Sequence, residues 1–196
     1  MVTLIIVDFQ NDFCLESGAL YVKGATNAMW NIEALLESGD ISRVIFTADW
    51  HMWKHPSFEE QGGPWPMHCV QYSTGAAISE LLLSACRNND IPHEVVTKGL
   101  YKEQYGALKD FHIDEDGDMC FDNETNLNDW LYFEDYRDAE YYICGLAGDY
   151  CVLETIKNLK PIWDRLRVYL PGIASIDGGE TLNNFIKENN LKVIEQ

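Results

Sequence analysis

Cys151 lies in a segment whose sequence could turn a thiol into a nucleophile. The apolar run 141–144 predicts a buried strand, and the small-residue turn Gly145-Leu146-Ala147-Gly148 follows it. From Asp149 onward apolar residues recur at helical spacing, so Cys151 falls in the first turn of a predicted helix. A helix N-terminus favours a thiolate, and its free N–H groups can hold an oxyanion. A small buried cysteine without a chemical role is the alternative interpretation of this residue alone.

Two charged residues follow other predicted strands. Asp8 ends the apolar run 2–7, where a carboxylate is either a general base with a shifted pKa or an acceptor for backbone N–H groups. Lys98 follows the predicted strand 94–97. Its ammonium would stabilise a neighbouring thiolate, and the alternative is an ordinary surface lysine.

A metal site is predicted in the long loop 49–74, which follows the predicted strand 43–48. Asp49 and His51 lie on the same side of an extended segment, and His68 follows in the same loop. One carboxylate and two imidazoles suit zinc and also iron or manganese, and three protein ligands leave coordination positions open for catalysis. His55 and Glu59 are candidates for a fourth ligand or for hydrogen bonds to the ligands. Histidines that only cap loop backbone are the alternative.

The order of the predicted elements would bring these side chains together. Strands are expected at 2–7, 43–48, 94–97, 141–144, 167–170 and 192–194, and helices at 24–38, 75–86, 125–133, from 149, and at 179–189. This alternation predicts a three-layer α/β/α fold, with a mostly parallel sheet of about six strands and helices on both faces. Right-handed crossovers place the carboxyl ends of the strands at one edge, where ligands bind in such folds.

The overall composition narrows the class of protein. The chain has 196 residues, which most simply form one domain over 1–196, and its net charge of −18 argues against nucleic acid or an anionic membrane as a partner. No stretch has the length and apolar character of a membrane span, and residues 1–7 lack the basic region of a signal peptide. We therefore expect a cytoplasmic protein with six free cysteines. The oligomeric state stays open, with a homo-oligomer as one option.

Two further features have competing interpretations. Phe13 and Trp65 lie near the proposed edge, where they would either sandwich a flat ring or pack as an ordinary lid. The acidic stretch 114–118 (DEDGD) does not match the ligand spacing of an EF-hand, so we expect a solvated hairpin turn. The surrounding segment 112–121 has no assigned role.

Five segments, in this order along the chain, carry a resemblance to a known family. They are 8–13 (DFQNDF), 47–51 (TADWH), 65–71 (WPMHCVQ), 97–99 (TKG) and 144–152 (CGLAGDYCV). Together they resemble the cysteine hydrolases of the isochorismatase-like superfamily and, within it, the nicotinamidases, also called pyrazinamidases. One departure is Gly148, which stands where the family more often has Thr, and we expect this change to loosen the turn.

The resemblance implies a role for each matching residue. It implies a catalytic triad of Asp8, Lys98 and Cys151, and metal ligation by Asp49, His51 and His68. It also implies a cis peptide between Leu146 and Ala147, with the oxyanion held by the N–H groups of Ala147 and Cys151. Phe13 and Trp65 would flank the pyridine ring. Whether His55 or Glu59 completes the metal site stays open.

The implied reaction is hydrolysis of nicotinamide, and also of pyrazinamide, to the acid and ammonia through a thioester. It would need one divalent metal, with zinc preferred over iron or manganese. A superfamily amidase that acts on another small amide is the alternative, although such relatives often lack the metal triplet that is intact here. A non-enzymatic binding module would be expected to have lost a triad residue, and none is lost.

Overall fold

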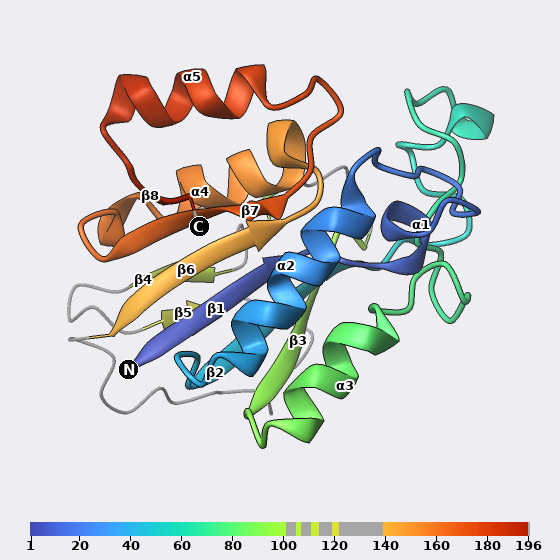
Figure 1. Ribbon diagram of the computed structural model, residues 1–196. Helices are drawn as coiled ribbons and strands as arrows, with labels where there is room; N and C mark the ends of the chain where they lie inside the picture. The colour runs from blue at the N-terminus through green and yellow to red at the C-terminus, as the bar shows by residue number, and fades with distance from the viewer. Residues whose placement is uncertain (101–104, 107–110, 114–118, 122–138, 196) are drawn as a thin grey trace.

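The centre of the molecule is a six-stranded parallel sheet. The computed structural model describes residues 1–100, 105–106, 111–113, 119–121 and 139–195. The strand order is β3-β2-β1-β6-β7-β8, and every neighbouring pair is parallel. The strands are β1 (Val2–Val7), β2 (Arg43–Asp49), β3 (His93–Lys98), β6 (Glu140–Gly145), β7 (Leu166–Ile173) and β8 (Lys192–Ile194). The predicted fold class is therefore confirmed, and the sheet is wholly parallel (Figure 1).

Helices cover both faces of this sheet. Helices α2 (Ala25–Glu37) and α3 (Glu80–Asn88) lie on the face toward the viewer in Figure 1, and α4 (Leu153–Asn158) and α5 (Glu180–Asn189) pack on the other. Successive residues of β1 divide between the two cores. Leu4 and Ile6 pack with α2 and α3, whereas Ile5 and Val7 pack with α4 and α5. This double coverage explains why the strand is apolar at every position.

The shorter elements differ in places from the predictions. They are α1 (Asn11–Cys14), the 3-10 turns η1 (Glu59–Gln61) and η3 (Lys160–Ile162), the π-helical turn η2 (Gly148–Val152), and the antiparallel pair β4 (Phe111–Ile113) and β5 (Met119–Phe121). The pairing of β4 with β5 is compatible with the predicted hairpin, but its turn 114–118 lies outside the described residues, as does the predicted helix 125–133.

Helix α3 begins later than the sequence suggests. The predicted start was residue 75, and the observed start is Glu80. The preceding residues bond instead to the segment that follows β1. Asn11 N–H donates to the carbonyl of Ala77, and Asp12 N–H donates to that of Gly75. These contacts hold the segment extended against the site.

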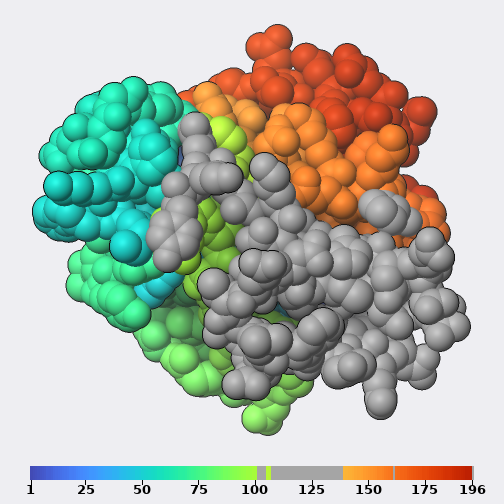
Figure 2. Space-filling model, turned by 180° about the vertical axis from the view of Figure 1, so that it is seen from behind, coloured from blue at the N-terminus to red at the C-terminus, as the bar shows by residue number. Residues whose placement is uncertain are grey.

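The carboxyl ends of the strands carry the chemically interesting residues. In Figure 1 the arrows of β1 and β6 point toward α1 and the loop that follows β2. Seen from behind, that loop forms a cyan-to-green lobe at one side of the molecule (Figure 2). Asp49 pairs directly with Lys98 across β2 and β3, so register alone makes them neighbours.

Two other findings bear on the composition arguments. Among the residues that the structure describes, no helix combines the length and apolar character needed to cross a membrane. Five cysteines (Cys14, Cys69, Cys86, Cys144 and Cys151) are free and buried.

Candidate active site

Asp8, Lys98 and Cys151 meet in the buried interior at the carboxyl edge of the sheet. The ammonium nitrogen of Lys98 lies 2.9 Å from Asp8 Oδ2 and 3.6 Å from Cys151 Sγ. It also forms an ion pair with Asp49. The side chain of Lys98 is 1% exposed, so this cation is neutralised by protein carboxylates rather than by water.

The backbone at Asp8 turns sharply out of β1. Its φ is +48°, a left-handed conformation that is uncommon for a residue other than glycine. Thr47 holds the turn, because its hydroxyl donates to Asp8 Oδ1 at 2.7 Å and its carbonyl accepts the Asp8 N–H at 3.2 Å. The second carboxylate oxygen is thereby directed to Lys98.

Burial dominates the protonation of these groups. It raises the pKa of Asp8 above the ordinary value, although Lys98 opposes the shift. Burial also raises the pKa of Cys151 well above its usual value. The positive charge of Lys98 lowers this pKa, but the negative charges of Asp8 and Asp49 raise it and so offset part of the effect of Lys98. Contrary to the expectation from the helix N-terminus, burial favours the thiol form of Cys151 over the thiolate. A base must remove its proton, and Asp8 is the neighbouring carboxylate.

The turn that presents Cys151 is shaped by close backbone contacts. Gly145 has a φ of +125°, and a Cβ there would lie 2.1 Å from the carbonyl oxygen of Val7. The Leu146–Ala147 peptide is cis, as the family resemblance implied. Cys151 lies in a π-helical turn that leads into α4, and not in a regular first turn.

Gly148 is closely surrounded in this turn, and the loosening expected from its missing side chain stays a prediction. Its N–H donates to the carbonyl of Ala174 at 2.9 Å. The space that a side chain at position 148 would take is filled by Ser175, whose Oγ lies 2.1 Å from an ideal Cβ. The side chain of Ser175 therefore occupies the space beside Gly148.

Asp49, His51 and His68 form a compact group at the same edge. Their candidate ligand atoms all lie within 4.8 Å of one another, and all three residues are buried. The distance from Asp49 Oδ2 is 3.5 Å to His51 Nε2 and 4.0 Å to His68 Nε2. Burial alone would raise the pKa of Asp49, but Lys98 and His51 hold it below its usual range. The carboxylate is therefore ionised.

The other ring nitrogens show that this group suits a divalent cation. His51 Nδ1 lies 2.6 Å from the carbonyl of Gly99, and His68 Nδ1 lies 2.7 Å from that of Pro66. A carbonyl only accepts, so both Nδ1 atoms donate and each Nε2 keeps its lone pair toward Asp49 in the neutral ring. Burial lowers the pKa of His68, which keeps it neutral. Such backbone support is typical of histidine ligands.

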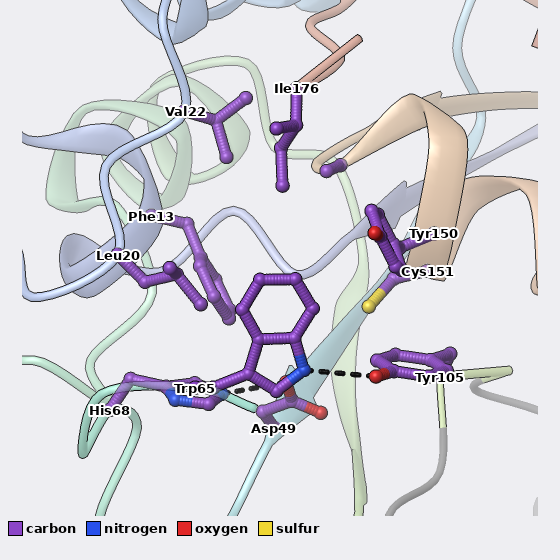
Figure 3. A pocket seen from close by; sticks show the side chains of 11 residues that line it. Phe13, Leu20, Val22, Asp49, Trp65, His68, Tyr105, Tyr150, Cys151 and Ile176 are labelled. Carbon is purple, nitrogen blue, oxygen red and sulfur yellow. Dashed lines mark hydrogen bonds and ion pairs between the residues drawn. The ribbon is translucent and has the colours of Figure 1, made fainter. Parts of the chain in front are cut away.

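One cavity of about 40 Å³ connects the two groups of residues. Cys151 and Ala147 line it on one side and Asp49 and His68 on another, with the rings of Phe13 and Trp65 between them (Figure 3). The lining is mostly aromatic or aliphatic, which suits a flat apolar ring.

Two tyrosines that the sequence analysis did not single out complete this wall. Tyr105 accepts a hydrogen bond from Trp65 Nε1 at 2.9 Å, and the Tyr150 ring meets Trp65 edge-on with centroids 5.3 Å apart. These contacts fix the Trp65 ring at the border of the cavity.

The chain is similar to known proteins over most of its length. The Isochorismatase domain matches residues 2–160, which is most of the chain. The chain belongs to the isochorismatase family. Among curated relatives, it is 33% identical to the nicotinamidase/pyrazinamidase of Mycobacterium tuberculosis over 164 residues, which cover 81% of this chain and 78% of that protein.

Solved structures agree with the family assignment. The yeast nicotinamidase bound to the inhibitor nicotinaldehyde superimposes with a TM-score of 0.78 at 27% identity, with full coverage of both chains. The pyrazinamidase of Pyrococcus horikoshii in complex with zinc gives a TM-score of 0.73 at 25% identity, covering 100% of this chain and 99% of that one.

Within this isochorismatase fold, the two candidates for a fourth ligand have different positions. His55 is buried and stacks on His51 with ring centroids 4.1 Å apart, and its Nδ1 lies 2.7 Å from Ser57 Oγ. Glu59 is exposed at the start of η1. Both lie outside the compact group of three, but only His55 adjoins it.

Sequence analysis missed two residues that hold the site of this family member in place. Gln10 brackets the backbone of Asp49, since its Nε2 donates to the Asp49 carbonyl at 2.8 Å and its Oε1 accepts the Asp49 N–H at 2.7 Å. Asp12 accepts the N–H of Cys69, next to His68, at 2.7 Å. Both belong to the polar segment directly after β1, which is the signal that could have identified them.

Proposed function

We propose that this chain is a nicotinamidase, a metal-dependent cysteine amidohydrolase that converts nicotinamide to nicotinate and ammonia and also accepts pyrazinamide. The observation that carries the proposal is the shared cavity, which joins Cys151 to the group of Asp49 and His68 between two aromatic rings. The similarity to a nicotinamidase/pyrazinamidase and to a nicotinamidase bound to nicotinaldehyde supports it.

The metal would be held by Asp49, His51 and His68. Zinc suits these donors best, iron and manganese are alternatives, and the relative in complex with zinc supports the choice. When bound, the ion would supply a ligand position for the ring nitrogen and so orient the ring. The intact group of three favours a pyridine or pyrazine amide over other small amides.

The first half of the reaction would form a thioester. Asp8 takes the proton from the Cys151 thiol as the sulfur attacks the amide carbon, and Lys98 stabilises the negative charge that develops between them. Asp8, whose pKa is raised by burial, then returns the proton to the leaving nitrogen, and ammonia departs. A carboxyl with a raised pKa suits both the acid and the base role.

The second half would release the acid. Asp8 accepts a proton from a water molecule that attacks the thioester carbon, and the thiol of Cys151 is regenerated with the proton that Asp8 returns. In both halves the oxygen of the tetrahedral intermediate would face the N–H groups of Ala147 and Cys151. One such donor lowers the barrier by roughly 3 kcal/mol.

Release of ammonia from three amides of similar shape tests the proposal. Nicotinamide and pyrazinamide should be hydrolysed, whereas benzamide, which lacks the ring nitrogen, should be a much poorer substrate. A chelator should abolish the difference, and added zinc should restore it. Equal rates with nicotinamide and benzamide would instead indicate an amidase for other small amides, and no ammonia from any of the three would refute the assignment.

Two coarser expectations belong to the same proposal. We infer that residues 1–196 act as a single hydrolase domain and that the protein works in the cytoplasm on a free small molecule, without nucleic acid or a membrane as a partner. The strongly acidic composition supports the absence of such anionic partners. Cell fractionation with an antibody to the protein would test the location.

A further inference from the structure

Ile176 is a large apolar residue at the mouth of the candidate active site. It lines the cavity although 53% of its surface is exposed. In Figure 3 its side chain and that of Val22 point into the cavity from the side opposite His68 and Asp49. An exposed isoleucine side chain contributes little hydrophobic free energy unless another apolar group covers it and removes its surface from water. A ring bound in the cavity is such a group.

A carboxylate beside the nucleophile holds Ile176 in this position. Asp149 Oδ1 accepts the backbone N–H of Ile176 at 2.9 Å, and its Oδ2 accepts that of Asp177 at 3.0 Å. Asp149 precedes Cys151 by two residues in the same turn. The loop that carries Ile176 is thus tied to the element that carries the sulfur.

The absence of a side chain at Gly148 allows the loop to come this close. A Cβ at position 148 would lie 2.1 Å from Ser175 Oγ and 2.7 Å from Ile173 Cγ2. Both residues belong to the stretch that leads to Ile176. A side chain at position 148 would therefore require Ser175 and Ile173 to shift.

We propose that Ile176 is a specificity-determining residue that selects pyridine amides without a substituent at ring carbon 5, and that Asp149 is its positioning residue. This inference rests on the proposed nicotinamidase function. With the ring nitrogen toward Asp49 and His68 and the carboxamide at Cys151, carbon 5 lies across the ring from carbon 2, the atom between these two anchored positions. Ile176 contributes to the wall of the cavity opposite Asp49 and His68.

The test compares nicotinamide with 5-ethylnicotinamide in the wild type and in Ile176→Ala. The ratio of kcat/KM for the ethyl compound to that for nicotinamide should rise about tenfold or more in the variant, since a few methylene groups in an apolar pocket discriminate by that factor. Val193→Ala, on strand β8, is the matched control because Val193 is also a partly exposed aliphatic residue. Its ratio should equal that of the wild type.

A double-variant cycle tests the role of Asp149. Asp149→Asn keeps the size of the side chain but removes one of the two acceptors, so it should shift the ratio in the same direction. If Asp149 acts through Ile176, the double variant should shift no further than Ile176→Ala alone. Additive shifts would overturn the positioning role.

The outcomes separate this inference from the function on which it rests. If the wild type hydrolyses nicotinamide and Ile176→Ala leaves the ratio unchanged, the specificity role is refuted and the proposed function stands. If the wild type releases ammonia from neither compound, the proposed function itself fails.

Discussion

Gly99 lies directly against the imidazole ring of His51. Its φ is +68°, and its carbonyl lies 2.6 Å from His51 Nδ1. A Cβ at this position would lie 2.8 Å from His51 Cε1 and 3.1 Å from Nδ1. Gly99→Ala would therefore strain the backbone and displace the imidazole ring of His51 in a single change.

Two effects of this substitution can be separated by magnitude. The left-handed conformation costs a residue with a side chain about 1–2 kcal/mol. Displacing the partner that orients a histidine ligand lowers metal affinity about 10- to 100-fold. Gly39→Ala isolates the first effect, because Gly39 has a φ of +84° and no atom lies within 4 Å of its ideal Cβ.

Zinc affinity and unfolding should be measured on both variants. Competition with a chromophoric chelator gives the affinity, and urea titration gives the free energy of unfolding. Both variants should lose stability in the absence of metal, Gly99→Ala at least as much as Gly39→Ala, and only Gly99→Ala should bind zinc 10- to 100-fold more weakly. If Gly99→Ala bound zinc as tightly as Gly39→Ala, or if the wild type bound none, the argument for a histidine held by Gly99 in a metal site would be refuted.

Three further predictions concern the nucleophile, the base and the scaffold. Cys151→Ala should lower kcat for ammonia release by about 10⁴-fold or more, and normal turnover in this variant would exclude the thioester route. Because burial raises the pKa of Asp8, its base form should be lost as pH falls at a higher pH than for an ordinary aspartate. The kcat/KM profile of the wild type should show this acid limb, and the residual activity of Asp8→Asn should lack it. Gln10→Ala removes the hydrogen-bond partner of three buried groups, which are the N–H and carbonyl of Asp49 and the carbonyl of Ala76. This change should lower the free energy of unfolding by about 3 kcal/mol in urea titration. Asn189→Ala, which removes one exposed bond to the carbonyl of Phe185, should cost under about 1 kcal/mol; equal losses would contradict the bracketing role of Gln10.

Much of the fold follows from local sequence signals. A strand covered on both faces must be apolar at each position, so runs such as Val2–Val7 were recognisable without any knowledge of their neighbours. The parallel order then places whatever follows each strand at one edge. This rule alone brought Asp8, Asp49 and Lys98 into proximity, as the distances between their side chains bear out.

The remaining features depend on contacts between distant segments. Nothing near Ile176 in the sequence indicates that its backbone is bound by Asp149, which lies 27 positions earlier. The same holds for Gly75, whose carbonyl accepts the N–H of Asp12, so that no helix starts there. The raised pKa of Cys151 has a related origin, since the helix N-terminus is a local feature whereas burial is a property of the whole fold.

The pairing of Asp49 with Lys98 across β2 and β3 makes the activity of the protein depend on the register of these two strands. A slip of one residue between these edge-proximal strands would turn the lysine to the opposite layer and leave a compact but inert molecule. The specific activity of a preparation would then report the fraction of chains in which β2 and β3 pair in the correct register. Secondary-structure content measured by spectroscopy would not reveal this fraction.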